Sequence, residues 1–438
     1  MPLIYLTGLS GTGKSTILRE LAKLGYTVHG VDEESYADWV HRSTGIIEKY
    51  PSDADTESDI HSWYSSHRWV LSPARILALR EEADSRESPI ILAGVAEGEQ
   101  EIWDAFHLVF ALCADDATLS TRIAARTGNA FGKTTDELNA ILGWNDGYRD
   151  RYLSYGAVVV EATRPLNRVV ETIATSINCL TLTPITEVNT VLSHFTGNLH
   201  LTFPETLIAT YLTGSLTYGG FELESSDIDL LAVLSRPPTQ NEIKALQECV
   251  QHIADKFPSW GNRIECSFIP EHWLSSTAIP ADPRPYLNGG SIRSCRYGNE
   301  WAINLNALHE CGRAIHGPAP SLLSTKVPIS RLQEASRLDL EEEWLPRLDI
   351  PSPFEQPGYD PNHLRAYAVL TMCRILHRDH HSGVASKREA AAWVCSAFPE
   401  WASLVSEATE WRHGASCSSD AAVLAFISFT AGTVLEPR

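Results

Sequence analysis

The stretch GSLTYGGFELESSDIDLL, residues 214–231, indicates both a fold and a chemistry for the second half of the chain. Gly214 and Ser215 are predicted to begin a helix after a strand that ends in YLTG, and Asp227 and Asp229 begin an apolar strand. Because alternate residues of a strand point to the same face, the two carboxylates are expected to lie side by side. Neighbouring carboxylates repel each other unless a cation separates them. The pair is therefore predicted to bind Mg²⁺.

The Gly-Ser turn is predicted to bind phosphate. Backbone N–H groups at the start of a helix, together with the Ser215 hydroxyl, suit the outer phosphates of a nucleotide. The alternative is a strand with two solvent-facing aspartates after a chance Gly-Ser pair, but the turn, the spacing and the apolar run LLAVL all agree with a site. A Gly-Ser turn followed by Asp-x-Asp resembles the nucleotidyltransferase family.

The composition is that of a globular protein with several domains. A length of 438 residues suggests about three domains of roughly 150 residues each. The net charge of −20 argues against a surface that follows a nucleic-acid backbone, and it is compatible with a cationic small molecule. We therefore expect a cationic small-molecule partner and no nucleic acid, while the oligomeric state stays open.

The cysteines and the apolar segments point to a cytoplasmic protein. The nine cysteines are scattered, without a CxxC pair or a zinc spacing, which is typical of reduced thiols. The N-terminus runs directly into a predicted strand and a Gly-rich turn, which leaves no room for a signal peptide. The longest apolar run, residues 421–435, is interrupted by polar residues and is shorter than the roughly 18 residues that a membrane span needs. No membrane partner is expected.

The first domain, predicted over residues 1–178, opens on a phosphate-binding loop. An apolar strand at residues 3–7 precedes GLSGTGKS, and ILRELAKL continues with a helical period, so G-x-x-x-x-G-K-[ST] stands in its strand, loop and helix context. Lys14 would reach the outer phosphates of ATP and Ser15 would offer its hydroxyl to Mg²⁺. The predicted nucleotide-binding residues of this loop are Gly8, Ser10, Gly11, Gly13, Lys14, Ser15 and Thr16.

An acid after the second strand is the candidate base of this first domain. Asp32 ends the segment YTVHGVD, and because the carboxyl ends of neighbouring parallel strands meet, it is expected beside the phosphate loop. The segment resembles small P-loop kinases, in which an acid at this place takes the proton from the acceptor hydroxyl. A plain capping role is the alternative. The third strand, residues 89–94, lacks the metal-binding acid of many P-loop proteins. Glu97 acting through water, or Asp32 itself, could replace that acid.

Two arginines resemble the lid of adenylate-kinase-like and shikimate-kinase-like enzymes. Arg122 and Arg126 lie four residues apart on one face of a predicted helix, and a Gly-containing loop follows as far as Lys133. In such lids arginines neutralise the transferring phosphoryl group. A solvated basic helix face is the alternative.

The second domain, predicted over residues 190–322 after a linker at 179–189, is expected to supply a third carboxylate. In NRIECSF, Glu265 alternates with apolar residues and so faces away from the core. Nucleotidyl transfer needs a base for the attacking hydroxyl or a further metal ligand, and we predict that Glu265 serves in both roles.

Residues from about 190 to 438 resemble the aminoglycoside 3''-adenylyltransferases. The shared features are TGSLTYGG, SDIDLL, the strand with Glu265, and HGPAP. The resemblance implies that Glu265 is the catalytic base. It also implies that Lys387, which follows the LT-x-x-R helix in a G-x-x-x-K pattern, contacts ATP phosphate. Asp360 matches one family acid that holds the ammonium groups of the drug, whereas a second such position is Leu364.

The sequence therefore predicts an α/β P-loop kinase domain with a parallel sheet, then an α+β nucleotidyltransferase domain and a C-terminal α-helical bundle at residues 323–438. The predicted function is Mg-ATP-dependent transfer of AMP to a hydroxyl of an aminoglycoside-like molecule, as in antibiotic resistance, with a second, kinase-like site. Two alternatives stay open. A polynucleotide or RNA end-processing enzyme is disfavoured by the acidic charge, and an ATP-sensing regulatory P-loop domain is favoured by the missing acid of the third strand.

Overall fold

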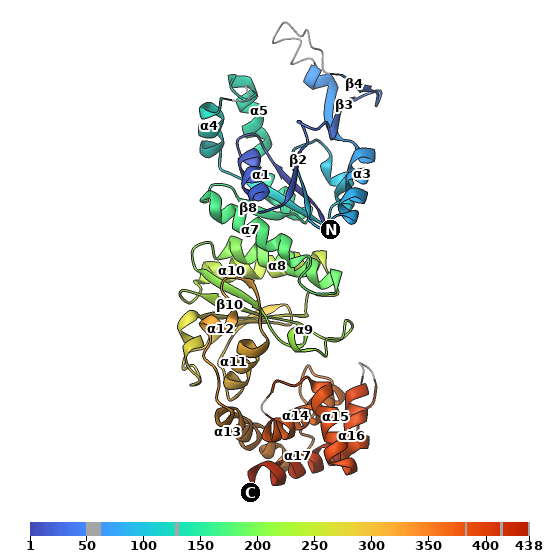
Figure 1. The fold of residues 1–438 in the computed structure, drawn as a ribbon, viewed down its shortest axis with the longest axis vertical. Coiled ribbons are helices and arrows are strands. Elements are labelled where there is room, and N and C mark those ends of the chain that lie inside the picture. The colour runs from blue at the N-terminus through green and yellow to red at the C-terminus, as the bar shows by residue number, and fades with distance from the viewer. Residues whose placement is uncertain (50–62, 128–130, 382, 412–414, 437–438) are drawn as a thin grey trace. The chain divides into compact units, whose positions relative to one another are not determined.

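The structure, a computed structural model, describes residues 1–49, 63–127, 131–381, 383–411 and 415–436. The chain divides into two compact units (Figure 1). The first comprises Met1–Glu205 and Glu248–Pro258, and the second comprises Thr206–Gln247 and Ser259–Arg438. Residues 128–130 of the predicted arginine-bearing lid lie outside the described residues.

A parallel sheet of five strands organises the first unit, in the order β2-β6-β1-β7-β8. The strands are β2 (Thr27–Gly30), β6 (Ile90–Gly94), β1 (Leu3–Gly8), β7 (Leu108–Cys113) and β8 (Val158–Glu161). Every residue of β1, β6 and β7 is buried, as expected for a parallel sheet covered on both faces. This arrangement confirms the predicted α/β fold of the N-terminal part.

Helices cover the two faces of that sheet. α1 (Lys14–Lys23) and α7 (Leu166–Cys179) pack on the face that carries Ile4, whereas α3 (Pro73–Ser85) packs on the face that carries Tyr5 (Figure 1). The remaining elements of the unit include a small sheet in the order β4-β3-β5. They are β3 (Ala37–His41), β4 (Ile47–Glu48), β5 (His67–Leu71), η1 (Glu99–Ala105), α4 (Asp116–Ala125), α5 (Thr135–Asn145), α6 (Tyr148–Ser154) and α8 (Thr186–Thr202).

Helix α8 groups with the first unit, although the sequence analysis began the second domain at residue 190. α8 packs along α7, where Cys179 Sγ lies 3.7 Å from Thr196 Oγ1. It also approaches β8 so closely that a Cβ at Gly197 would lie 2.4 Å from a methyl of Val158. The contacts thus define two units, and the division into three domains stays a prediction.

A mixed sheet of six strands organises the second unit, in the order β13-β12-β11-β10-β9-β14. Only β10 and β11 pair in parallel, and the other neighbours pair antiparallel. The strands are β9 (Leu207–Leu212), β10 (Ile228–Leu234), β11 (Ile264–Pro270), β12 (Arg284–Asn288), β13 (Ser291–Cys295) and β14 (Arg313–His316). The associated helices are α9 (Ser215–Tyr218), η2 (Glu271–Ser275), α11 (Glu300–Cys311) and α12 (Pro320–Leu323). Helix α10 (Gln240–Lys256) begins in the second unit, and its residues from Glu248 onward group with the first unit.

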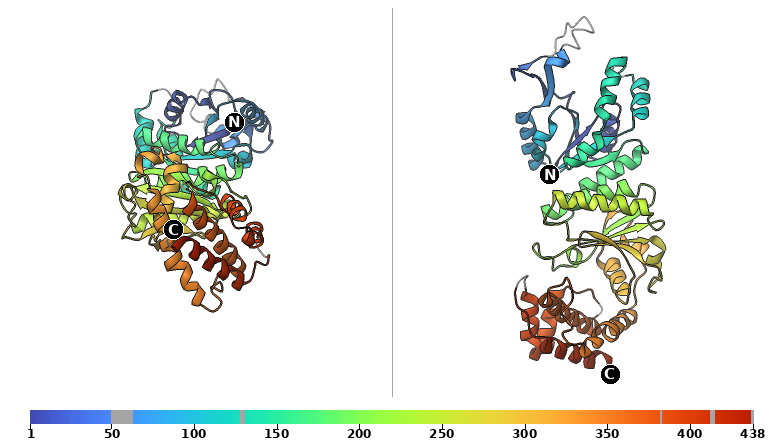
Figure 2. Two further views of the ribbon diagram at one scale, coloured as in Figure 1. Left: turned by 60° about the horizontal axis from the view of Figure 1, so that its bottom comes forward. Right: turned by 180° about the vertical axis from the view of Figure 1, so that it is seen from behind.

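Helices are the regular elements of the remaining described residues of the second unit, and α14 to α17 lie together as a bundle (Figures 1 and 2). Their buried core includes Val369, Met372, Val394 and Phe426. The elements are α13 (Ile329–Asp339), the π-helical turn η3 (Leu340–Trp344), η4 (Leu345–Asp349), α14 (Pro361–His380), α15 (Lys387–Ala397), η5 (Pro399–Trp401), α16 (Ala402–Glu410) and α17 (Asp420–Leu435). Within the described ranges, none of the helices has both the length and the apolar character needed to cross a membrane.

Candidate active site

Three predicted acids of the second unit lie together at the start of β10 and β11. Asp229 pairs with Glu265 across the parallel strands, and Asp227 directly precedes β10. Burial raises the pKa of Asp229 to about 7, and the charges of Glu265 and Asp227 add to the rise. Burial also raises the pKa of Asp227, against the attraction of Arg263 and Lys387. Each of these negative charges is therefore costly unless a cation approaches.

Gly214 brings the predicted phosphate turn directly against Asp229. Its φ is +64°, and a Cβ at this position would lie 1.8 Å from Asp229 Oδ2, so only glycine allows the approach. The backbone N–H of Ser215 favours the charged form of Asp229. Because α9 is a single turn, its individual N–H groups, more than a helix dipole, would attract phosphate here.

Glu265 is held by two hydrogen bonds from β12. Tyr286 Oη donates to Glu265 Oε2 at 2.5 Å, and Asn288 Nδ2 donates to Oε1 at 2.6 Å. The antiparallel register, which pairs Ser267 with Tyr286, puts these side chains on the face of Glu265. Burial raises the pKa of Glu265, while the bond from Tyr286 lowers it. The sequence analysis missed Tyr286 and Asn288, whose only signal is a polar residue on each side of the buried Leu287 in PYLN.

Lys387, the first residue of α15, faces these acids from the helical part of the unit. Burial lowers its pKa and Arg374 lowers it further, whereas Asp229, Asp227 and Glu265 oppose the shift. A capping box fixes this helix start, because Ser386 N donates to Glu389 Oε2 at 2.8 Å and Glu389 N donates to Ser386 Oγ at 3.2 Å. The structure therefore brings Lys387 into the electrostatic field of the three predicted carboxylates.

Two arginines on α14 extend the basic side of the site. Arg374 Nε is buried without a hydrogen-bond partner among the described residues. Arg378 donates to Ser336 Oγ at 2.6 Å, and burial lowers the pKa of Arg378 to about 10. Both guanidinium groups stabilise the ionised form of Tyr218, at the end of α9. The sequence analysis gave neither arginine a role, although Arg374 is the arginine of the LT-x-x-R pattern.

Asp227 and Asp229 fit a magnesium site better than the three-carboxylate set predicted from the sequence. Within the described ranges, no group of three or more His, Cys, Asp or Glu side chains is arranged to hold a metal. Both oxygens of Glu265 already accept hydrogen bonds. The two aspartates offer hard oxygen ligands, and no ion pair joins them to another described residue. Mg²⁺ commonly uses one or two carboxylates and takes its remaining ligands from water and phosphate.

Asp360, the predicted drug-binding acid, lies at the N-cap of α14. Its carboxylate accepts the N–H of Asn362 at 2.9 Å. This bond satisfies one of the unpaired amides of the first helical turn. Asp360 therefore has a local structural role, and its contact with a substrate stays a prediction.

The phosphate loop of the first unit has the backbone that its glycines predict. Gly11 and Gly13 have φ values of +92° and +94°, a conformation that other residues rarely adopt. Lys14 Nζ donates to the carbonyl oxygen of Gly8 and to that of Leu9 at 3.3 Å. Burial lowers the pKa of Lys14 to about 8, against the attraction of Asp32 and Glu99. The lysine thus lies folded over its own loop.

Both predicted lid arginines contact this loop. Arg126 Nη1 donates to Ser10 Oγ at 2.9 Å, and Arg122 Nη1 donates to the carbonyl oxygen of Thr12 at 3.4 Å. Ser15 and Thr16 lie exposed in the first turn of α1. The structure therefore brings both arginines to the phosphate loop, and their role in binding a phosphoryl group stays a prediction.

Asp32 interacts electrostatically with Lys14 of this loop. Desolvation raises its pKa and Glu33 adds to the rise, while Lys14 and a hydrogen bond from Trp69 lower it. Glu97, which could replace the acid that the third strand lacks, forms an ion pair with Arg42. Arg42 Nη1 donates to Glu97 Oε1 at 2.7 Å.

The buried acid behind the phosphate loop is Glu99. It accepts hydrogen bonds from Tyr5 Oη at 2.7 Å, from Tyr152 Oη at 2.5 Å and from the N–H of Ala96 at 3.0 Å. Burial raises the pKa of Glu99, and these donors lower it. No sequence pattern distinguishes Glu99, because Glu97, Glu99 and Glu101 alternate with other residues in one acidic segment.

Two family models match separate parts of the chain, one in each compact unit. Residues 4–141 match the family described as AAA domain. Residues 349–431 match the family described as aminoglycoside adenylyltransferase, C-terminal domain. The matches confirm the resemblances predicted for the N-terminal P-loop part and for the C-terminal part.

Solved structures with distant similarity also match parts of the chain. A spectinomycin adenyltransferase AAD(9) from Enterococcus faecialis, solved with ATP and spectinomycin, is 20% identical over 56% of this chain and 98% of its own, with a TM-score of 0.44. A shikimate kinase from Acinetobacter baumannii, solved with shikimate, is 19% identical over 42% of this chain and 96% of its own, with a TM-score of 0.29. No curated protein sequence matches the chain significantly.

Proposed function

We propose that the second unit transfers AMP from Mg-ATP to a hydroxyl of an aminoglycoside-like cation. The observation that carries this proposal is the arrangement of Asp227, Asp229 and Glu265 opposite Lys387 within one compact unit. Carboxylates that suit a divalent cation then stand opposite a cation that suits phosphate, which is what the polyphosphate of Mg-ATP requires.

Glu265 is the proposed general base. Its two hydrogen bonds fix the carboxylate, and its raised pKa makes it a stronger proton acceptor than an exposed glutamate. As Glu265 takes the proton of the acceptor hydroxyl, that oxygen forms a bond to the α-phosphorus. The bond from the α-phosphorus to the bridging oxygen of pyrophosphate then breaks, and pyrophosphate leaves.

Asp227, Asp229, Lys387 and Arg374 would stabilise the charge that moves in this reaction. Mg²⁺ held by the two aspartates would neutralise charge on the reacting phosphate and on the leaving pyrophosphate. Lys387 interacts electrostatically with the three carboxylates, and Arg374 Nε is buried without a partner among the described residues, so both cations would stabilise negative charge on phosphate here. The Gly214 turn would bind the remaining phosphate oxygens through its N–H groups.

The first unit carries a second proposed site, of the small-molecule kinase type. Lys14 and Arg126 would bind the transferring phosphoryl group of ATP, and Asp32 would accept the proton of an acceptor hydroxyl. The contacts of Arg126 with Ser10 and of Arg122 with Thr12 support this assignment. A regulatory unit that only binds ATP is the second candidate, favoured by the absence of a metal-binding acid in β6, which reads IILAG.

One experiment tests both sites. The chain is incubated with Mg-ATP and a panel of aminoglycosides, spectinomycin, shikimate, nucleosides and oligonucleotides. Mass spectrometry of the products then detects an added AMP or phosphate group. The proposal expects AMP on a cationic antibiotic and equimolar pyrophosphate. AMP only on oligonucleotides would support the end-processing alternative. Absence of AMP transfer to every acceptor, with folded protein, would refute the proposed function.

A further inference from the structure

The linking loop, residues 219–226, joins the end of α9 to the candidate acids of the second unit. It begins with Gly219 and Gly220, whose φ values of +88° and +87° are rare for residues with a side chain. It ends with Ser226, which directly precedes Asp227. The position of this loop therefore affects both the phosphate turn before it and the acids after it.

Local hydrogen bonds fix the backbone of Glu222 within the linking loop. Its N–H donates to Ser226 Oγ at 2.9 Å. Its carbonyl oxygen accepts the N–H groups of Ser225 at 3.2 Å and of Ser226 at 2.8 Å. Because Ser226 is bonded to Glu222 in both directions and is followed at once by Asp227, the turn fixes the backbone of Glu222 relative to that of Asp227.

Arg263, the residue before β11, anchors the linking loop to the sheet. Its Nη2 donates to the carbonyl oxygen of Leu223 at 2.8 Å and to that of Ser226. Its guanidinium carbon lies 4.3 Å from the centroid of the Trp260 ring, which is buried. The ring of Phe221 stacks on the same Trp260, with centroids 6.5 Å apart and planes 13° apart. The loop is thus held to the sheet that carries the candidate acids.

The linking loop also contacts the start of α15. Arg388 Nε donates to Glu222 Oε1 at 3.0 Å, and Arg388 Nη2 donates to the same oxygen. Gly220 lies so close to Ser386 that a Cβ at Gly220 would be 3.2 Å from the Cβ of Ser386. Ser386 and Arg388 are the two chain neighbours of Lys387. The loop therefore contacts the helix start on both sides of the lysine in the sequence.

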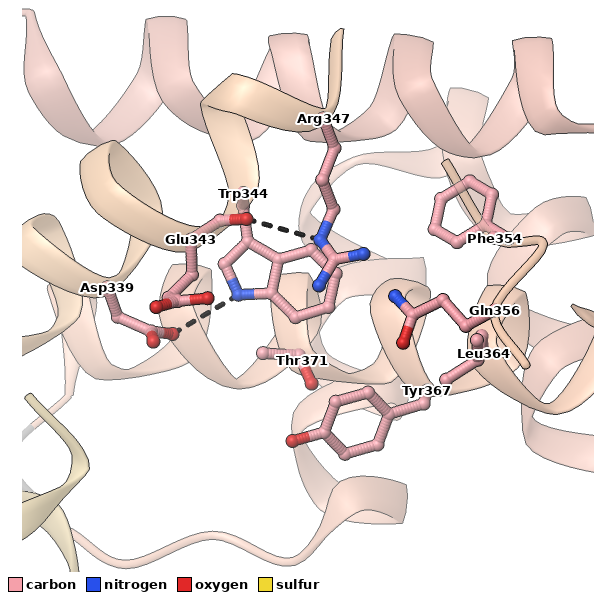
Figure 3. A pocket seen from close by; sticks show the side chains of 9 residues that line it. All are labelled: Asp339, Glu343, Trp344, Arg347, Phe354, Gln356, Leu364, Tyr367 and Thr371. Carbon is pink, nitrogen blue, oxygen red and sulfur yellow. Dashed lines mark hydrogen bonds between the residues drawn. The ribbon is translucent and has the colours of Figure 1, made fainter. Parts of the chain in front are cut away.

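Helix α14 gives Lys387 one further contact. Tyr367, which lines the cavity between η3 and α14 (Figure 3), lies with its ring centroid 5.7 Å from Lys387 Nζ. An aromatic ring attracts an ammonium group, but the four-carbon stem of lysine stays flexible. The position of the Lys387 backbone therefore decides which phosphate oxygens its ammonium can reach, and that position is set at the start of α15.

We propose that Glu222 and Arg388 are positioning residues of the AMP-transfer site: their ion pair holds the start of α15, and with it Lys387, close to the candidate acids. The proposal rests on the proposed function and assigns to that site two residues that act through Lys387. A cation already held where phosphate binds loses less conformational entropy when the nucleotide arrives. Breaking the pair should therefore weaken the binding of Mg-ATP more than it slows the chemical step.

An ordinary surface ion pair is the alternative. The side chains of Arg388 and Glu222 are 56% and 27% exposed, and exposed pairs contribute little to stability. This pair, however, joins residues that are 166 positions apart in the chain, so it connects two segments that local geometry does not bring together. Arg236 forms a comparable exposed pair, with two hydrogen bonds to Glu242, just beyond the end of β10 away from the acids. It therefore serves as the matched control.

The test uses the full chain and two readouts. The first is the KM of Mg-ATP and the kcat for AMP transfer, and the second is hydrogen exchange of residues 386–397 with and without Mg-ATP. Glu222→Arg and Arg388→Glu each put like charges side by side, so each should raise KM by about 3- to 10-fold and change kcat less than about 2-fold. Each should also speed exchange at the start of α15. The double variant restores the pair with its charges exchanged and should return both readouts to within about 2-fold of the wild type.

Rescue in the double variant, with less than about 2-fold change in Arg236→Gln, would support the proposal. Unchanged readouts in both single variants, a double variant no better than the single ones, or an equal effect in Arg236→Gln would overturn it. Glu222→Gln keeps the side-chain shape and should raise KM by about 2- to 5-fold, so it replaces a reversed charge that prevents folding. If the wild type transfers no AMP to any acceptor, the proposed function fails, and the exchange readout alone decides whether the pair holds the start of α15.

Discussion

Tyr286 donates its phenolic hydrogen to Glu265 Oε2 at 2.5 Å, so a strand that carries no predicted site residue orients the candidate base. Asn288 binds the other oxygen of the same carboxylate at 2.6 Å. A carboxylate fixed at both oxygens has little freedom to rotate, and general-base catalysis depends on such positioning. Glu265 is therefore better suited to accept a proton than to move toward a metal.

Glu265→Gln should lower kcat for AMP transfer by at least about 10²-fold, because glutamine keeps the shape and loses the base. The Kd of Mg-ATP should stay nearly unchanged, since Asp227, Asp229 and Lys387 remain in place. Steady-state kinetics and a nucleotide titration check both parts. An enzyme with glutamine at this position and full turnover would remove Glu265 from the mechanism.

Gly214→Ala should abolish most AMP transfer, because the new Cβ would lie 1.8 Å from Asp229 Oδ2 and must displace that carboxylate. A displacement of about 1 Å at a reacting group can cost about 10²-fold in rate. Gly219→Ala is the matched control, since Gly219 also has a positive φ, of +88°, but a Cβ there meets nothing within 4 Å. Similar losses in the two variants would show that backbone strain, not the clash with Asp229, causes the effect.

His194 should make the first unit less stable in mild acid. Burial lowers the pKa of His194 to about 3, with Lys256 adding to the effect, from an ordinary value of 6.5. Below pH 6.5, His194 is protonated in the unfolded chain but stays neutral in the folded chain. The free energy of unfolding should therefore fall by up to about 1.4 kcal/mol for each pH unit as the pH decreases from about 6.5 toward 3.

Urea unfolding at a series of pH values, with hydrogen exchange of α8 as the local probe, measures this slope. His194→Phe keeps an apolar ring at the buried position and should flatten the dependence. His272→Gln, a substitution of an exposed histidine, is the control and should leave the dependence unchanged. A wild-type slope that persists in His194→Phe would assign the acid sensitivity to other groups.

Local sequence patterns were sufficient to predict the parts of both sites that depend on neighbouring residues. The positive φ values of Gly11 and Gly13 follow from the phosphate-loop motif, and the proximity of Asp227 to Asp229 follows from the two-residue period of a strand. Lys387 was placed through a family resemblance, and the structure brings it to the acids.

Residues that depend on tertiary pairing could not be predicted in this way. Tyr286 meets Glu265 only because β12 pairs with β11 in one register. Glu97 and Glu99 are two residues apart in one acidic run, yet the first pairs with Arg42 at the surface and the second is buried with Tyr5. Burial distinguishes them, and burial depends on how the whole unit packs.

Independence of the two sites is the last prediction. Each site has its own phosphate-binding groups, Lys14 in the first unit and Lys387 in the second, so two nucleotides should bind per chain. Lys14→Ala removes the point charge on the outer phosphates, which should abolish phosphoryl transfer by the first unit and leave AMP transfer nearly intact. Asp227→Ala should do the reverse. Both variants are incubated with the same acceptors, and each product is followed by mass. If Lys14→Ala stops AMP transfer in a chain that stays folded, the first unit either gates the second through bound nucleotide or makes its substrate, and the two sites are not separate enzymes.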